Sequence, residues 1–89
     1  MKQIERIDDT IKFFGSMTSA DAIPRCGIGN FSARMSDAMK VYPIKRVAVK
    51  RKLPNRYGDR PIYYRYYYEK DKVVFPKGED VIKWLDENE

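Results

Sequence analysis

A tight-turn signal followed directly by an amphipathic helix is the feature that most constrains the fold of this chain. Gly27 and Gly29 can adopt the positive φ angles that a sharp turn needs. Asn30 is a good helix N-cap, because its side-chain oxygen can accept a hydrogen bond from a free backbone N–H. Small and polar residues follow on one side of the helix, and apolar residues recur at helical spacing on the other. The pattern predicts a helix over residues 30–40 with an apolar stripe of Phe31, Met35, Ala38 and Tyr42, with Met39 beside it.

Two helical segments are predicted before this turn. The first runs from Gln3 to a stop at Gly15, and its apolar stripe is formed by Ile4, Ile7, Ile11 and Phe14. The second, over residues 18–26, is expected to be short or irregular because Pro24 lacks a backbone N–H. Its inward-facing residues are expected to be Ala22, Ile23 and Cys26. The order of helix, short helix, glycine turn and helix is typical of a helix-turn-helix.

The second half of the chain predicts a β-hairpin and a final helix. Residues 45–53 alternate in polarity, and residues 62–69 are rich in side chains that favour a pleated sheet. Residues 54–61 between them have the composition of a loop. Residues 73–75 could add a short third strand, and residues 79–88 are predicted to form a helix.

This order predicts an α+β fold of the winged helix-turn-helix type. Three N-terminal helices are followed by a basic β-hairpin, the wing, and by a short C-terminal helix. We expect a single domain over residues 1–89, because a chain of this length supports one core. Its parts are a helical part at 1–44, the wing at 45–69 and an extension at 70–89.

The residues needed for common enzyme chemistry are missing from the sequence. The chain has one cysteine and no histidine, so neither a disulfide nor a Cys/His zinc cluster can form within it. Cys26 is expected to be a buried structural thiol. Without a phosphate loop or a nucleophile–base pair, we expect no enzyme activity, cofactor, metal or small-molecule substrate. No apolar run could span a bilayer and no signal peptide is recognisable, so a cytoplasmic protein without membrane contact is expected.

Positive charge is concentrated in the middle of the chain. Residues 45–65 hold eight Lys and Arg against Asp59, a net charge of +7. Residues 1–44 carry a net charge of +1, and residues 66–89 carry −3. Such a basic segment favours a polyanionic partner, although charge can also simply protect a strand edge from aggregation.

The helix and its exit resemble a family of small helix-turn-helix domains common in phages and prophages. The resembling residues are Ile28, Gly29, Phe31, Ser32, Ala33, Arg34, Met35, Ala38, Tyr42, Pro43 and Ile44, with the basic hairpin after them. The resemblance covers residues 11–68 and departs from the family at two positions. The family usually has glycine where Val41 stands, and often a basic residue where Asn30 stands. The resemblance implies binding to double-stranded DNA in a bacterial nucleoid, in the control of phage genes or of excision.

Two groups of residues are the candidates for DNA contact. On the helix, base edges or phosphates would be contacted by Asn30, Ser32, Ser36 and Lys40. Arg34 either contacts a phosphate or pairs with Asp37. On the hairpin, phosphates would be neutralised by Lys45, Arg46, Lys50, Arg51, Lys52, Arg56 and Arg60. Arg56 and Arg60 lie in the loop, where they could enter a minor groove.

Other functions remain open from the sequence. Alternation along the second strand separates Tyr64, Tyr66 and Tyr68 from Tyr63 and Tyr67. One set is expected to pack on the helices, and the other could stack the bases of single-stranded DNA or RNA. The hairpin could instead dock an acidic protein, as in a protein-interaction winged helix. The C-terminal helix is expected either to cover the fold or to form a homodimer contact.

Overall fold

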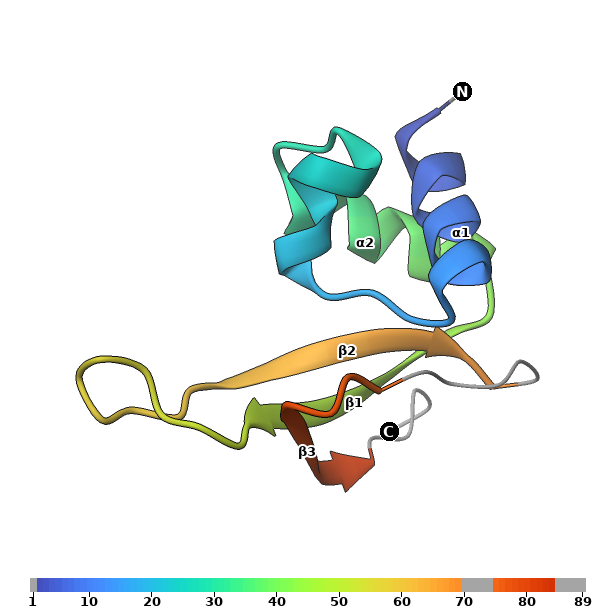
Figure 1. The fold of residues 1–89 in the computed structure, drawn as a ribbon. Helices are drawn as coiled ribbons and strands as arrows, with labels where there is room; N and C mark the ends of the chain where they lie inside the picture. Colours follow the sequence, from blue (N-terminus) through green and yellow to red (C-terminus); the bar gives the residue numbers. More distant parts are fainter. Residues whose placement is uncertain (1, 70–74, 85–89) are drawn as a thin grey trace.

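The structure, a computed structural model, describes residues 2–69 and 75–84. Its elements in order are α1 (Gln3–Phe14), the 3-10 turn η1 (Ser19–Asp21), the π-helical turn η2 (Ala22–Cys26), α2 (Phe31–Val41), β1 (Ile44–Arg51), β2 (Ile62–Tyr68) and β3 (Glu79–Trp84). The three strands form one antiparallel sheet in the order β2-β1-β3. All helical elements lie on one side of this sheet (Figure 1).

The predicted winged helix-turn-helix layout is wrong, because its C-terminal helix is absent over the described residues. The C-terminal helix expected at 79–88 is replaced over Glu79–Trp84 by β3, which pairs with β1. The short or irregular helix expected at 18–26 is a 3-10 turn followed by one π-helical turn, which agrees with the missing backbone donor of Pro24. The fold is an α+β arrangement of three helical segments followed by a three-stranded antiparallel sheet. Residues 85–88 of the expected helix, and 73–74 of the expected third strand, lie outside the described residues.

β3 pairs with the edge of β1 that β2 leaves open. Backbone N–H and C=O groups on such an edge can pair with another strand, and β3 pairs with them over Val47–Arg51. Val81 and Ile82 are β-branched, which suits a strand better than a helix. Their apolar spacing in the sequence fitted a helix as well, so only the pairing with β1 distinguishes the two.

The helical part has the core that its apolar stripes predict. Ile7 and Ile11 of α1 are buried against Met35 and Ala38 of α2. Ile28, in the turn before α2, is fully buried in the same cluster. The three segments therefore pack around one apolar centre above the sheet.

Two apolar residues that were expected to face the core are exposed to solvent. Ile23 is 71% exposed, because the wide π-helical turn directs it away from the core that its neighbours Ala22 and Cys26 join. Phe14 is 39% exposed at the last position of α1, and the guanidinium of Arg25 lies 3.8 Å from its ring centre.

The turn before α2 needs only one of its two glycines for backbone geometry. Gly27 has a φ of 67°, in the left-handed region that favours glycine. Gly29 does not adopt the positive φ that its missing Cβ would permit. The Asn30 side chain accepts a hydrogen bond from the Ala33 backbone N–H at 3.4 Å, which confirms it as the N-cap.

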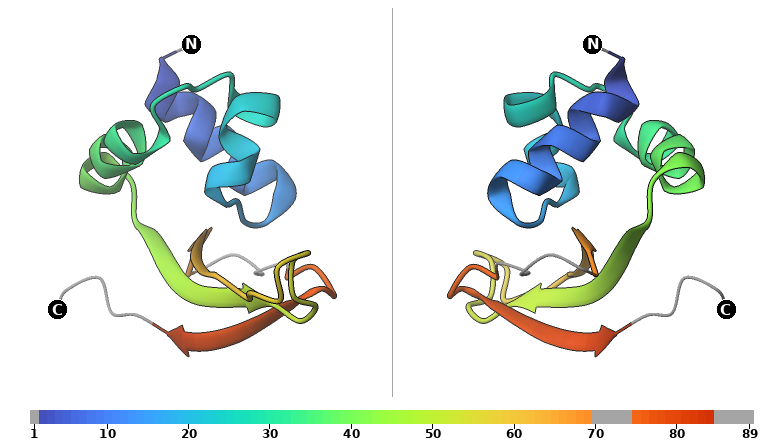
Figure 2. Two further views of the ribbon diagram at one scale, coloured as in Figure 1. Left: turned by 90° about the vertical axis from the view of Figure 1, so that its left-hand side faces the viewer. Right: turned by 90° about the vertical axis from the view of Figure 1, so that its right-hand side faces the viewer.

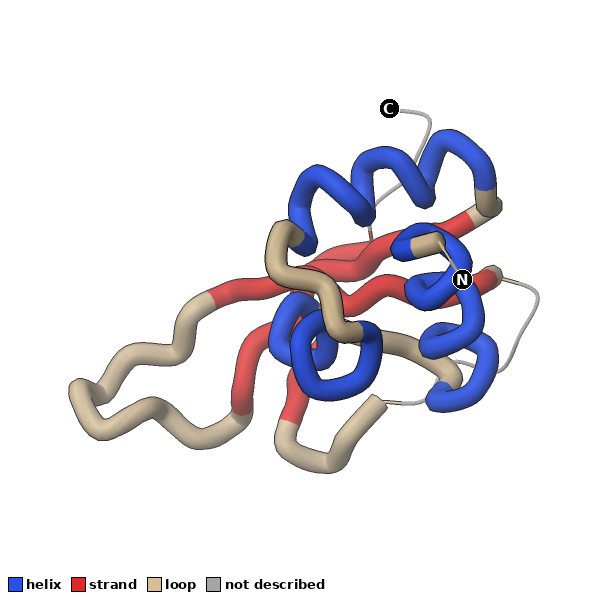
Figure 3. Tube along the Cα trace, turned by 90° about the horizontal axis from the view of Figure 1, so that it is seen from above, coloured by secondary structure: helices blue, strands red, loops and turns tan. Residues whose placement is uncertain are grey.

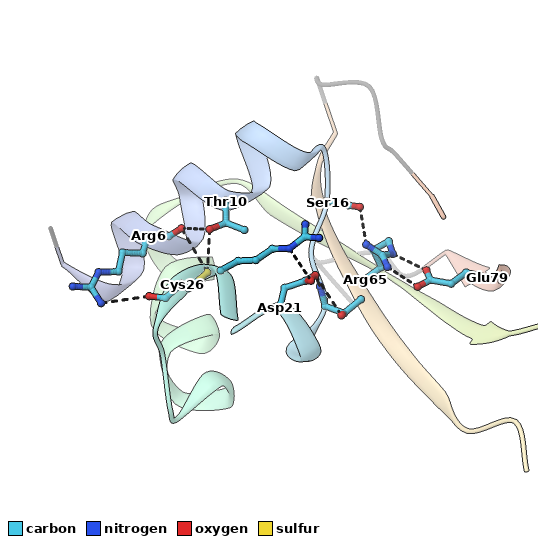
Figure 4. Close-up of polar contacts among 9 residues, drawn as sticks. Arg6, Thr10, Ser16, Asp21, Cys26, Arg65 and Glu79 are labelled. Carbon is cyan, nitrogen blue, oxygen red and sulfur yellow. Dashed lines mark hydrogen bonds and ion pairs between the residues drawn. The ribbon is translucent and has the colours of Figure 1, made fainter. Parts of the chain in front are cut away.

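Cys26 is a structural thiol, as expected. It is buried, and its Sγ lies 3.0 Å from the Thr10 hydroxyl of α1 (Figure 4). The Arg6 side chain also reaches the Cys26 carbonyl oxygen at 3.4 Å. These contacts fix the end of η2 against α1.

The tyrosines of β2 pack on both faces of the sheet. Strand pairing separates them as predicted, into Tyr64, Tyr66 and Tyr68 on one face and Tyr63 and Tyr67 on the other. Tyr66 and Tyr68 pack against the helical core, and Tyr67 is buried with Val47 and Val49 on the far face. Tyrosine packing therefore supplies core on both sides of a thin sheet.

The outer edge of β2 is closed by the segment between α1 and η1. Met17 and Tyr66 exchange both backbone hydrogen bonds, at 2.9 and 2.7 Å. Since Met17 is also fully buried, this short bridge joins the helical part to the sheet.

Candidate nucleic-acid interface

The loop joining β1 to β2 projects away from the rest of the molecule. β1 ends at Arg51 and β2 begins at Ile62. The connecting loop extends beyond the end of the sheet, where no helix covers it (Figures 1 and 3). We call residues 51–62 the hairpin arm.

The base of the hairpin arm is attached to β3. Asp80 forms an ion pair with Arg60 at 3.0 Å and a longer ion pair with Lys52 at 3.8 Å. Arg60 Nε also donates to the Arg51 carbonyl oxygen at 2.6 Å. The backbone N–H of Lys52 donates to the carbonyl oxygen of Gly78 at 2.9 Å. Lys52 and Arg60, both predicted to contact DNA, therefore also brace the arm.

The tip of the arm is a hydrogen-bonded turn. The Asn55 side-chain oxygen accepts from the backbone N–H groups of Tyr57 and Asp59, at 2.9 and 3.0 Å. Backbone hydrogen bonds link Asn55 N to Asp59 O and Gly58 N to Asn55 O, at 2.8 and 2.9 Å. Gly58 has a φ of 82°, which this closure needs. Residues 55–59 therefore form an ordered turn although they are exposed.

The arm carries its cations in solvent. Arg51, Lys52 and Arg56 are exposed, and Arg60 is half-buried by its pairing. The Arg56 guanidinium lies 4.8 Å from the Tyr57 ring centre and donates to the Tyr57 hydroxyl at 2.5 Å. Phosphate oxygens could therefore reach Arg51 and Arg56, and also Lys52 if they replace its long ion pair with Asp80.

The cations predicted on β1 are less open. Lys45, Arg46 and Lys50 are half-buried. The Arg46 guanidinium lies 4.7 Å from the Tyr64 ring centre, on the face of the sheet shared with the helices. This stacking holds Arg46 in place but leaves part of its side chain in water.

One cation of the basic segment is not available to a ligand. Arg65 is 7% exposed and donates to the Glu79 carboxylate at 2.6 and 2.5 Å, and to the Ser16 hydroxyl at 3.0 Å (Figure 4). Glu79 also accepts from the Tyr63 hydroxyl at 2.6 Å. This cluster joins β2, β3 and the segment after α1, so it positions the base of the arm.

Two pKa values in this cluster are shifted. Burial and the hydrogen bond to Glu79 raise the pKa of Tyr63 to about 12. Burial alone would raise the pKa of Glu79, but hydrogen bonds from Arg65 and Tyr63 outweigh it and hold that pKa below its usual value. Glu79 is therefore ionised at neutral pH and balances the buried Arg65.

The outer face of α2 is open, as predicted. Its exposed candidates are Asn30, Ser32, Ser36 and Lys40. Arg34 is half-buried and forms an ion pair with Asp37 at 3.2 Å, one of the two alternatives left open by the sequence. Its Nε is buried and has no hydrogen-bond partner within the described part of the chain.

The predicted site residues fall on two separate surfaces. In Figures 2 and 3, α2 lies along one side of the molecule and the hairpin arm leaves from another. The sequence predicted the two groups but not their separation. It also missed Asp80 and Glu79, because those residues were assigned to the start of a helix.

No family model, curated protein or solved structure matches the chain. Over residues 2–69 and 75–84, no helix has the length and apolar character needed to cross a membrane. The same residues contain no group of three or more His, Cys, Asp or Glu side chains that could hold a metal ion.

Proposed function

We propose that this chain binds double-stranded DNA. The hairpin arm contacts phosphates and an adjacent minor groove, and the exposed face of α2 contacts a major groove. The projecting arm is the observation that carries the proposal, since a braced loop with exposed Arg51, Lys52 and Arg56 suits a polyanion. The resemblance to phage helix-turn-helix domains supports a role in transcription control or recombination, at the nucleoid in the cytoplasm of a bacterial host.

The packing of β2 favours duplex over single-stranded nucleic acid. Among the five tyrosines of β2, Tyr64 alone is exposed, at 40%. A stacking platform for single strands needs several open rings along a groove. The other four tyrosines are buried or half-buried, so they act mainly as core.

The role of the arm can be tested with matched charge removals. Arg51→Ala/Arg56→Ala removes two exposed cations from the arm, and Lys2→Ala/Lys12→Ala removes two exposed cations from the N-terminal helix region. We expect the first pair to weaken binding to random duplex DNA by about tenfold or more, because two phosphate contacts are lost. The second pair should change affinity by less than about threefold. Equal losses of affinity in the two double variants would mean that only the net charge of the protein matters, and would overturn the role of the arm.

The role of α2 needs a separate test. Ser36→Glu places a negative charge on the exposed face of α2, and Gln3→Glu places the same charge at the exposed start of α1. We expect Ser36→Glu to reduce duplex affinity strongly and Gln3→Glu to leave it nearly unchanged, since only the first repels phosphates in the groove. If both variants bind like the original chain, α2 is not a contact surface.

A further inference from the structure

The hairpin arm combines two large exposed apolar side chains, Leu53 next to its base and Tyr57 in its tip, with exposed cations. Leu53 is 79% exposed and Tyr57 is 72% exposed. Single exposed apolar residues are common on protein surfaces, but here two lie on one projecting loop. Exposed Arg51, Lys52 and Arg56 lie close in sequence to them. A partner of this arm should therefore offer both negative charge and an apolar surface.

The conformation of the arm is held by interactions at both its tip and its base. Its tip is closed by the Asn55 and Gly58 hydrogen bonds, and its base is held by Asp80. Pro54 and Pro61 restrict the backbone on both sides of the tip. A loop that is already ordered loses little conformational entropy when it binds.

We propose that the arm bends DNA by wedging Leu53 and Tyr57 between base pairs from the minor groove. This inference rests on the proposed duplex binding and adds what the arm does there. The minor groove concentrates negative potential where it is narrow, which attracts arginine. Apolar side chains inserted from that groove unstack a base step and kink the duplex.

The contact between Arg56 and Tyr57 fits this role. The guanidinium stacks on the ring and donates to its hydroxyl, so both groups present one face of the tip together. On insertion, Arg56 would neutralise the phosphates or groove atoms that flank the opened step, while Leu53 supplies an aliphatic surface for the exposed bases. Flexible pyrimidine–purine steps should be preferred, since they unstack most easily.

Bending can be measured separately from binding. A duplex of about 30 base pairs with a central TA step and a fluorophore at each end reports its end-to-end distance by energy transfer at saturating protein. The original chain should raise the transfer efficiency. Leu53→Ser/Tyr57→Ser should still bind, with an unchanged salt dependence because every cation remains, but should leave the duplex nearly straight. Tyr57→Phe keeps the ring and should still bend it.

A matched control removes an apolar surface elsewhere. Val41→Ser changes a side chain that is 64% exposed at the end of α2, and it should bend DNA like the original chain. Binding without any bend in the original chain, or an unchanged bend in the double variant, would overturn the wedge but leave duplex binding intact. Failure to bind duplex at all would overturn the proposed function as well.

The same tip chemistry could suit an anionic membrane surface, so vesicles are part of the test. Vesicles of phosphatidylserine and phosphatidylcholine should bind the original chain and the double variant equally weakly, through charge alone. Vesicle binding that depends on Leu53 and Tyr57, together with an unbent duplex, would assign the tip to a membrane and overturn the wedge.

Discussion

At the scale of single residues, the most consequential feature is the buried ion pair between Arg65 and Glu79. The Arg65 side chain is 9% exposed and the Glu79 side chain 8%. Both charged groups are removed from water. The Tyr63 hydroxyl donates a further hydrogen bond to Glu79, and Arg65 donates one to the Ser16 hydroxyl. Such a pair contributes little compared with an apolar pair of the same shape, yet removing one partner alone is costly.

Glu79→Ala should therefore destabilise the fold by about 3 to 5 kcal/mol, because it leaves Arg65 charged and buried. Urea denaturation at neutral pH measures this loss. Arg65→Met/Glu79→Met should recover most of it, since neither charge remains. The more open pair of Arg34 and Asp37, whose side chains are 40% and 47% exposed, provides the control, and Asp37→Ala should cost less than about 1 kcal/mol. A small loss for Glu79→Ala would show that water reaches Arg65.

The pKa shifts in this cluster predict the pH range of stability. Because the folded pKa of Glu79 is lowered, its stabilisation is present above its usual pKa of about 4.5 and is lost as the pH falls through the folded value. Because the folded pKa of Tyr63 is raised, its stabilisation is present below pH 10 and is lost as the pH rises through about 12.

Unfolding free energies across this pH range check both signs. Glu79→Gln should flatten the acid side of the profile, and Tyr63→Phe should flatten the alkaline side while costing only about 1 kcal/mol at neutral pH. An alkaline profile unchanged by Tyr63→Phe would contradict the assignment.

At the scale of elements, the two glycines of the turn before α2 differ in whether their backbone conformation requires glycine. Gly27 needs its positive φ, whereas Gly29 does not. A Cβ at Gly27 would lie 3.5 Å from Arg6 Nη1, an ordinary contact, and a Cβ at Gly29 would meet nothing within 4 Å. Backbone conformation, not space, therefore separates the two positions.

Gly27→Ala should cost about 1 to 2 kcal/mol, because alanine is strained in the left-handed region. Gly29→Ala should be neutral or stabilise by up to about 1 kcal/mol, since it restricts only the unfolded chain. Thermal unfolding of the two variants side by side measures the difference. Equal losses would mean that the turn uses a different geometry in solution.

At the scale of the whole molecule, the helices and the sheet form a body from which the hairpin arm projects. Basic residues 45–65 do not form one uniform surface in this body. Arg65 is buried, Lys52 and Arg60 are paired with Asp80, and only part of the positive charge predicted from the sequence is free for a ligand.

The salt dependence of DNA binding should report how many cations contact phosphates. If about five phosphates are neutralised, the logarithm of the binding constant should fall with the logarithm of salt concentration with a slope of roughly −4 to −5. Arg51→Ala/Arg56→Ala should make this slope shallower by about 1.8, because two contacts are removed. Fluorescence anisotropy with a labelled duplex between about 50 and 200 mM salt measures both slopes. A slope near zero would contradict phosphate contact.

Local patterns determined much of this protein. The stripes of α1 and α2, the Asn30 cap and the alternation of the β2 tyrosines all follow from patterns within a few residues. Such features depend on helical or strand periodicity and on turn chemistry, which a sequence displays directly. The basic segment and its loop could be located in the same way.

Only the tertiary structure decided what residues 79–84 become and which cations stay free. Their apolar spacing suited a helix, but the open edge of β1 made them a strand, and a distant edge leaves no trace in a local pattern. That pairing brought Glu79 to Arg65 and Asp80 to Lys52 and Arg60. Charge in the sequence is a sum over residues, whereas the charge offered to a partner depends on which side chains the fold has already paired.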